Sequence, residues 1–97
     1  PTAIFAANDL MALQVMDKVI EMGYRVPEDV SVLGFDNIPI ASHQRINLTT
    51  VDIQINRGAR ETVLNLINLI EGICTAKDLV NVILEPSLVV RTSTASR

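Results

Sequence analysis

Two short apolar runs on either side of a helix-like segment most restrict what this 97-residue chain can fold into. Residues 2–7 (TAIFAA) form a continuous apolar run without alternation, the pattern of a strand buried on both faces of a parallel sheet. Residues 30–35 (VSVLGF) form a second run, rich in β-branched side chains. Residues 10–22 between them carry apolar side chains at helical spacing, with Asp9 as the expected N-cap and Gly23 just past the helix end. Together the three segments predict a βαβ unit and an α/β fold.

The carboxyl ends of the two predicted strands carry polar side chains, Asn8 after the first and Asp36 after the second. The crossover of a βαβ unit is nearly always right-handed, so both strands run in one direction and end at the same sheet edge, where ligands of open sheets bind. An amide and a carboxylate at that edge can hydrogen-bond the hydroxyls of a sugar or a ring nitrogen of a base. Asn and Asp also commonly cap helices and turns, so the spacing alone leaves a ligand role and a capping role open.

The second half of the chain contains one further strand and one further helix. Residues 37–47 are expected to form a loop with room for one helical turn, and residues 48–53 a strand. A helix is predicted over residues 59–71, because apolar side chains recur there at i, i+4, i+7, i+8 and i+11. These side chains are Ala59, Val63, Leu66, Ile67 and Ile70. Residues 79–90 are expected to be extended around Pro86, and the last seven residues to form a loosely ordered tail.

The composition argues against several classes of function. The net charge is -3, with eight basic residues scattered among eleven acidic ones, so the chain lacks the clustered Lys and Arg that bind a phosphate backbone. His43 and Cys74 stand alone without metal-ligand spacing, and no nucleophile elbow, dinucleotide fingerprint or P-loop is present. No cofactor, metal or enzymatic activity is therefore indicated. A single cysteine fits a reducing cytosol and thus a cytoplasmic protein. No apolar run approaches the ~20 residues that span a bilayer.

Four segments of the chain resemble the LacI/GalR family of transcriptional regulators. The runs PTAIFAANDLMAL, RVPEDVSVLGFDN, LTTV and SLVVRTST occur in that family in this order and spacing, and together they cover nearly the whole chain. The resemblance implies a type I periplasmic-binding-protein-like fold, of which this chain would be the C-terminal part and an incomplete domain. Residues 1–50 would belong to the C-terminal subdomain, residues 51–78 to the crossover and a helix of the N-terminal subdomain, and residues 79–97 to a returning strand and tail.

The resemblance also implies roles for particular residues. Asn8 and Asp36 match the Asn of the N-D segment and the Asp of the G-F-D segment, which bind the effector in that family. Gln54 lies beside Ile53, where the family often has a Gln near the crossover, and is the third candidate effector-binding residue. The family's dimer interface implicates residues of the first helix and of the loop after Asp36. These are Leu13, Met16, Asp17, Ile40 and Gln44.

The function that the resemblance implies is effector sensing and dimerisation in a LacI-type repressor. The effector would be a sugar or a related small molecule, a second copy would form a homodimer, and DNA would be bound only by an N-terminal helix-turn-helix outside this chain. The alternative is the periplasmic sugar-binding protein of a transporter, which shares the N-D and G-F-D segments. An α/β enzyme would need further reactive groups at the strand ends. The apolar face of the helix over 59–71, left uncovered, predicts that this chain by itself associates as a dimer.

Overall fold

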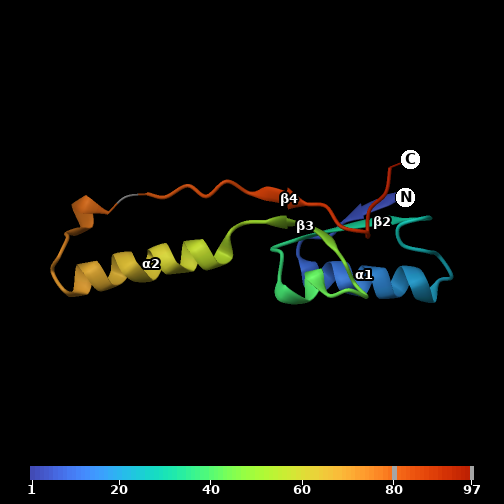
Figure 1. The fold of residues 1–97 in the computed structure, drawn as a ribbon, viewed down its shortest axis with the longest axis horizontal. Coiled ribbons are helices and arrows are strands. Elements are labelled where there is room, and N and C mark those ends of the chain that lie inside the picture. The colour runs from blue at the N-terminus through green and yellow to red at the C-terminus, as the bar shows by residue number, and fades with distance from the viewer. Residues whose placement is uncertain (80, 97) are drawn as a thin grey trace. The chain divides into compact units, whose positions relative to one another are not determined.

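The computed structural model describes residues 1–79 and 81–96, and the chain divides into two compact units. The first unit comprises Pro1–Ile53 and Pro86–Arg97, and the second comprises Gln54–Glu85. The elements are, in order, β1 (Ala3–Phe5), α1 (Asp9–Glu21), β2 (Ser31–Phe35), the 3-10 turn η1 (Pro39–Ser42), β3 (Thr49–Asp52), α2 (Ile55–Ile70), the 3-10 turn η2 (Ala76–Asp78) and β4 (Ser87–Val89). Both helices and the strands β2, β3 and β4 are labelled in Figure 1.

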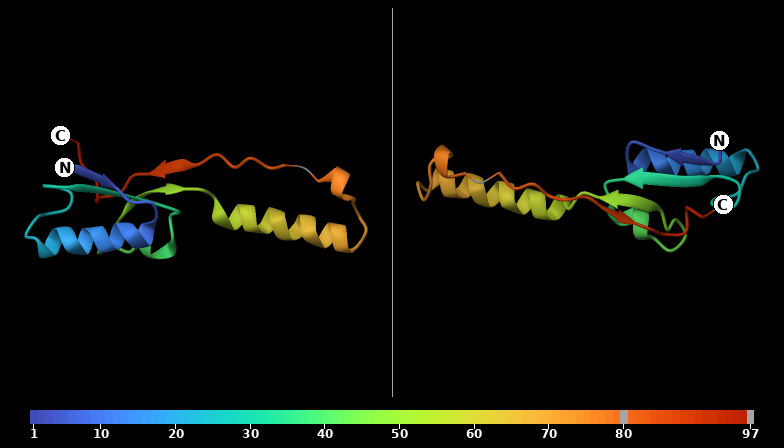
Figure 2. Two further views of the ribbon diagram at one scale, coloured as in Figure 1. Left: turned by 180° about the vertical axis from the view of Figure 1, so that it is seen from behind. Right: turned by 90° about the horizontal axis from the view of Figure 1, so that it is seen from above.

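The first unit is a four-stranded sheet in the order β1-β2-β3-β4, with α1 on one of its faces (Figure 2). β1 pairs with β2 and β2 with β3 in parallel, whereas β4 returns antiparallel to β3. The predicted βαβ unit is therefore confirmed, with its two strands adjacent and parallel. The burial predicted for the first strand is wrong, because β1 lies at the edge of the sheet and Phe5 remains 62% exposed. β2, between β1 and β3, is the better covered strand, and its Val32 is fully buried.

The ends of α1 differ from the expected helix by one residue. Asn8, with an extended backbone, is the N-cap, and its side-chain oxygen accepts a hydrogen bond from the backbone N–H of Met11 at 2.8 Å. The prediction that Asp9 caps the helix is wrong, since Asp9 is already the first helical residue. Gly23 follows the helix with φ 85°, the left-handed conformation that glycine adopts at little cost, as predicted.

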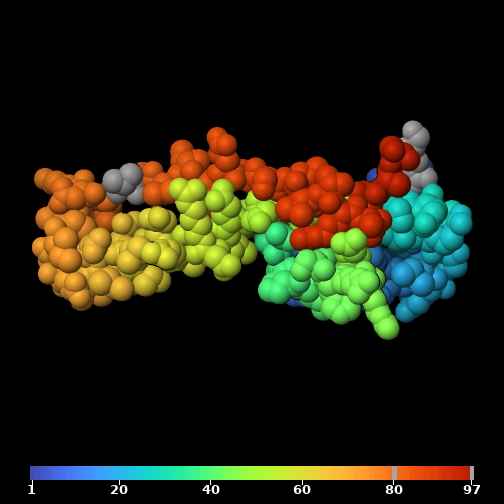
Figure 3. Space-filling model, in the orientation of Figure 1, coloured from blue at the N-terminus to red at the C-terminus, as the bar shows by residue number. Residues whose placement is uncertain are grey.

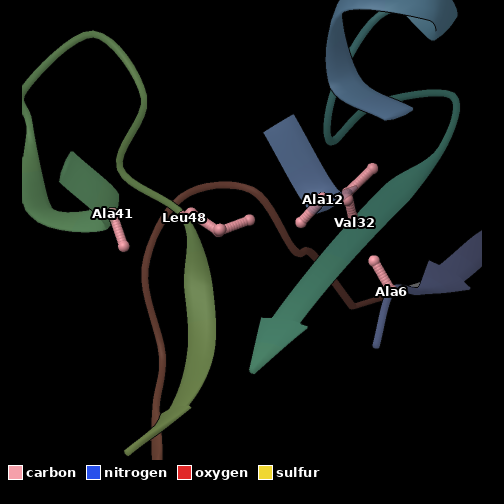
Figure 4. Close-up of a cluster of buried hydrophobic side chains, with 5 residues drawn as sticks. All are labelled: Ala6, Ala12, Val32, Ala41 and Leu48. Carbon is pink, nitrogen blue, oxygen red and sulfur yellow. The ribbon is translucent and has the colours of Figure 1, made fainter. Parts of the chain in front are cut away.

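The core of the first unit is small and lies between the sheet, α1 and η1 (Figure 4). Its buried members are Ala6, Ala12, Val32, Ala41 and Leu48. Partly buried aliphatic side chains pack around them, among them Val15 and Met16 of α1 and Ile38 before η1. The single helical turn expected between residues 37 and 47 is η1, which brings Ala41 into this core.

The segment after β4 is not the loose tail that the sequence predicts. Ser93 is 2% exposed, and its hydroxyl donates to the carbonyl of Val32 at 2.6 Å and accepts from the backbone N–H of Thr49 at 2.8 Å. The backbone N–H of Val32 in turn donates to the carbonyl of Ser93 at 2.8 Å. Figure 3 shows the red C-terminal part of the chain packed against the rest of the first unit. The prediction fails because polar tail residues satisfy buried backbone groups of the sheet, which an apolar pattern does not reveal.

The second unit contains α2 and the turn η2, and ends at Glu85. α2 begins at Ile55, four residues before the predicted start, because Gln54 adopts a left-handed backbone (φ 56°) as its N-cap and Ile55 continues the apolar stripe. None of the α2 residues is buried, and its predicted apolar stripe is exposed, with Ile70 at 75%. Of the predicted extended segment 79–90, Val80 lies outside the described residues and only Ser87–Val89 is a strand, because pairing with β3 covers just those positions.

Within the described part of the chain, no helix combines the length and the apolarity needed to cross a membrane.

Candidate functional site

The carboxyl edge of the parallel sheet is the candidate site. Asn8 follows β1, Asp36 follows β2, and Asp52 is the last residue of β3. Because these three strands are adjacent and parallel, their carboxyl ends lie at the same edge, which is where open α/β sheets bind ligands. The fold thus brings the backbones of the two predicted effector-binding residues, Asn8 and Asp36, to neighbouring strand ends. Their contact with an effector remains a prediction.

Asn8 takes the capping role, one of the two that the sequence left open, and its ligand role remains a prediction. Its Oδ1 atom caps α1 through the backbone N–H of Met11. Its Nδ2 group makes no hydrogen bond to the residues that the structure describes. One end of the amide is therefore used to begin the helix, while the other end still has two protons to donate. A capping Asn can accordingly also hold a ligand.

Asp36 has an unusual backbone for a residue with a side chain. Its φ is 108°, and its backbone N–H donates to the carbonyl of Val51 on β3 at 2.9 Å. A non-glycine residue in this region costs of the order of 1–3 kcal/mol, which must be offset by surrounding structure, and such residues cluster at functional sites. The side chain is half-buried at the sheet edge. Its carboxylate can accept hydrogen bonds from ligand hydroxyls.

Asp9 lies beneath this edge, and it is not the helix cap that the sequence predicts. It is fully buried, accepts from the hydroxyl of Thr50 at 2.5 Å, and accepts from the backbone N–H of Ile38 at 2.8 Å. Gly34 gives it room, because a Cβ atom at position 34 would overlap Asp9 Oδ1. The signal that could have revealed this contact is Thr50 itself, a hydroxyl in the middle of a buried strand, which needs a partner.

Asn37 is a second residue that the sequence did not single out. Its φ of 52° lies in the left-handed region, which Asn tolerates better than most residues. Its Nδ2 donates to Asp52 Oδ2 at 3.0 Å, and its Oδ1 accepts from Arg91 Nη2 at 2.9 Å. Its backbone N–H donates to Thr50 Oγ1 at 3.3 Å. The turn that carries Asp36 is therefore fixed by contacts of the next residue.

Gln54, the third predicted effector-binding residue, belongs to the second unit, whereas Asn8 and Asp36 belong to the first. Its Nε2 donates to the backbone carbonyl of Glu85 at 2.9 Å, and its Oε1 lies 3.4 Å from Arg57 Nη1. This side chain thus joins the first and last residues of the second unit. Its role in effector binding remains a prediction.

The predicted interface residues differ in how far they are available to a partner. Met16 is partly buried against the core, and Leu13 is half-buried. Ile40 on η1 is 46% exposed, and Asp17 and Gln44 are also exposed. A single chain does not test a dimer, so the interface stays a prediction.

Other groups do not form a competing site. A cavity of about 510 Å³ lies near the amino end of β1 and the end of α1, but neither Asn8 nor Asp36 lines it. Among the described residues, no three His, Cys, Asp or Glu side chains are grouped as metal ligands. His43 Nδ1 accepts from the backbone N–H of Arg45 at 3.2 Å, a contact local to its loop. Hydrogen bonds from Thr75 lower the pKa of Asp78, which belongs to the capping box of η2 and lies in the second unit.

Comparison with known proteins gives a consistent result. A family model described as periplasmic binding protein-like domain matches residues 1–94. The HTH-type transcriptional repressor PurR of Aliivibrio fischeri is 37% identical over 99 residues, covering 100% of this chain and 28% of PurR. A LacI-family regulator from Corynebacterium glutamicum superposes with a TM-score of 0.88 at 36% identity, over 98% of this chain and 36% of that one. The regulator CelR in complex with cellobiose gives a TM-score of 0.81 at 38% identity, over 95% of this chain and 28% of CelR.

The chain thus spans 28% of the length of PurR and 36% of the Corynebacterium regulator. The matches cover nearly all of its residues, including both units and the edge that carries Asn8 and Asp36. The chain therefore belongs to the family of periplasmic binding protein-like domains, in the form found in LacI-family transcriptional regulators.

Proposed function

We propose that the protein is a LacI-type transcriptional repressor and that this chain forms part of its effector-binding and dimerisation core. The observation that carries the proposal is the position of Asn8 and Asp36 after the carboxyl ends of adjacent parallel strands. One amide end of Asn8 is left to donate, and the carboxylate of Asp36 accepts. A donor next to a charged acceptor suits a polyhydroxylated ligand, whose hydroxyls need both kinds of partner.

The proposed effector is a sugar or a related small molecule. A related regulator, CelR, has been solved with cellobiose, at 38% identity over 95% of this chain. Asp36 would accept hydrogen bonds from ligand hydroxyls, and Asn8 Nδ2 would donate to a ligand oxygen. Gln54 is the proposed third contact. A ligand that binds one conformation of the protein better than another shifts the equilibrium toward the first, by as much as the two affinities differ.

The proposed output is a change in DNA binding elsewhere in a cytoplasmic homodimer. The net charge of -3 and the scattered basic residues make this chain an unsuitable DNA contact, so operator binding is assigned to a helix-turn-helix outside it. Effector and operator would then be coupled at a distance, each changing the affinity of the other by the same factor. The transporter alternative is less well supported, because the relatives that match are named as repressors and regulators.

The test is calorimetric titration of the intact protein with cellobiose, lactose, glucose, ribose and adenine, alongside gel-shift measurement of binding to the DNA upstream of its own gene. Asp36→Ala should weaken binding of the active compound about tenfold to a hundredfold, because a charge-assisted hydrogen bond is lost, while DNA binding without the compound is unchanged. Glu21→Ala is the matched control, since it removes an exposed carboxylate whose partner is the exposed Lys18. An Asp36→Ala protein that binds the compound as tightly as the wild type would refute the assignment.

A further inference from the structure

Asn37 connects the candidate site to the two strands that link the units. The chain leaves the first unit after β3 and re-enters it at Pro86, just before β4. β3 and β4 will be called the connecting strands. They pair antiparallel, with Asp52 opposite Ser87 at the end where the chain passes to and from the second unit. Within the described residues, these two strands therefore lie next to the covalent links between the units.

The side chain of Asn37 contacts the end of one connecting strand and the chain just beyond the other. Its Nδ2 donates to the carboxylate of Asp52, the last residue of β3, at 3.0 Å. Its Oδ1 accepts from Arg91, two residues past β4, at 2.9 Å. Arg91 is itself fixed to the start of the other strand, since its Nη1 donates to the carbonyl of Leu48 at 2.7 Å. One amide group therefore joins the end of β3 to the chain beyond β4.

The backbone of Asn37 ties the same residue to the ligand edge. It follows Asp36 directly, and both residues have positive φ, 108° and 52°. Its N–H donates to Thr50 Oγ1, and that hydroxyl donates to the buried carboxylate of Asp9. Because consecutive residues in such a turn cannot rotate independently, a ligand that moves Asp36 also moves the amide of Asn37.

We propose that Asn37 is a positioning residue that couples effector contact at Asp36 to the connecting strands through its hydrogen bonds to Asp52 and Arg91. The proposal rests on the proposed function, in which Asp36 contacts the effector. Asparagine suits the task because one side chain must donate to a carboxylate and accept from a guanidinium. Aspartate at this position would keep the bond from Arg91 but would face Asp52 with a second negative charge.

The test exploits this donor and acceptor pattern. Asn37→Asp removes the donor to Asp52, and Asn37→Gly removes both side-chain bonds while tolerating the left-handed backbone. The double variant Asn37→Asp with Asp52→Asn restores the bond with donor and acceptor exchanged, since the new amide at position 52 donates to the new carboxylate at 37. Asn47→Asp is the matched control: Asn47 also has positive φ (46°), but its side chain donates to Thr92 and not to the end of β3.

Hydrogen exchange of the intact protein without ligand gives the first readout. The peptide covering residues 49–54 should exchange about tenfold faster or more in both single variants, the factor expected from one lost charge-assisted hydrogen bond. The peptide covering residues 86–91 should do so in Asn37→Gly, which also loses the bond from Arg91. The double variant should return residues 49–54 to near the wild-type rate, and Asn47→Asp should leave them unchanged. Unchanged exchange in both Asn37 variants, or no recovery in the double variant, would overturn the proposal.

The second readout separates coupling from binding. For the compound that binds in the calorimetric panel, Asn37→Asp should keep a Kd within about threefold of the wild type, since the variant retains Asp36. The same variant should lose the ligand-induced change in hydrogen exchange at residues 49–54 and the ligand-induced change in DNA affinity. Asp36→Ala should instead lose binding itself. An Asn37→Asp protein that loses binding as Asp36→Ala does would identify Asn37 as a ligand contact and overturn the coupling role. If no compound binds the wild type, the proposed function fails, whereas the link from Asn37 to the connecting strands is still decided by exchange alone.

Discussion

Replacing Gly34 by alanine tests the packing beneath the ligand edge. A Cβ atom at this position would overlap Asp9 Oδ1 and lie 3.0 Å from Leu48 Cδ2. Asp9 cannot move aside freely, because its two oxygens accept from the Thr50 hydroxyl and from the Ile38 backbone N–H. The variant must therefore either strain the strand or give up these bonds.

The magnitude depends on which of those two routes the protein takes. Overpacking a filled core costs about 1–3 kcal/mol, and each hydrogen bond to a charged group that is lost costs about 1.5–3 kcal/mol. We expect Gly34→Ala to lower the free energy of unfolding by about 2–5 kcal/mol, a large share of the roughly 5–15 kcal/mol typical of a whole domain. In an Asp9→Ala background, which removes the obstructing oxygen but not the contact with Leu48, the same substitution should cost at least about 1 kcal/mol less, so the two changes are non-additive.

Urea denaturation of the intact wild-type protein, the two single variants and the double variant, followed by circular dichroism, measures the coupling. Gly23→Ala is the control, because Gly23 has φ 85° and nothing within 4 Å of an added Cβ. Its cost of about 1–2 kcal/mol comes from the left-handed backbone and should be the same with or without Asp9. An equal cost of Gly34→Ala in both backgrounds would refute the reasoning, since the clash with Asp9 would then not be the cause.

Three further predictions concern other parts of the chain. Asn8→Asp should keep the stability of α1 within about 0.5 kcal/mol, because Asp caps helices as well as Asn does, yet weaken effector binding through loss of the Nδ2 donor; equal affinity in calorimetry would leave Asn8 a cap only. Thr75→Ala should raise the lowered pKa of Asp78 toward its ordinary value in an NMR titration, and an unmoved pKa would contradict this. Because the capping contact favours the ionised carboxylate, the wild-type turn should loosen only as the pH falls through that lowered pKa. The 97-residue chain by itself should sediment as a dimer at micromolar concentration, because each large aliphatic side chain on the exposed face of α2 gains about 1.5–3 kcal/mol on burial; a well-folded monomer would contradict the prediction.

Features that depend on local periodicity were the ones predicted best from the sequence. The parallel pairing of β1 and β2 came from two apolar runs around a helical segment, and both are adjacent strands in the structure. The position of Gly23 after α1 came from the special conformational freedom of glycine. Such features depend on a few neighbouring residues, so a local pattern determines them.

Features that depend on partners far along the chain were predicted least well. Asn8 and Asp9 are adjacent, and both residue types are common helix caps. What distinguishes them is that Asp9 accepts hydrogen bonds from Thr50 and Ile38, which lie far from it along the chain. Ser93 looked like part of a polar tail because its partners, Val32 and Thr49, precede it by at least 44 residues. β1 is exposed because it lies at the edge of the sheet. An apolar run predicts a strand but does not indicate its position in the sheet.

The bonds of Ser93 also set an order of events during synthesis. Its hydroxyl and carbonyl serve the backbone of Val32, 61 residues earlier in the chain, which a ribosome delivers first. Until residue 93 has left the exit tunnel, the N–H and C=O of Val32 lack these partners in an otherwise apolar strand. β3 likewise has no antiparallel partner until β4 has been synthesised. The early part of the chain can therefore collapse during translation but cannot complete its sheet. Nascent chains arrested before residue 93 should expose this strand to chaperones and proteases, whereas those arrested well beyond it should not.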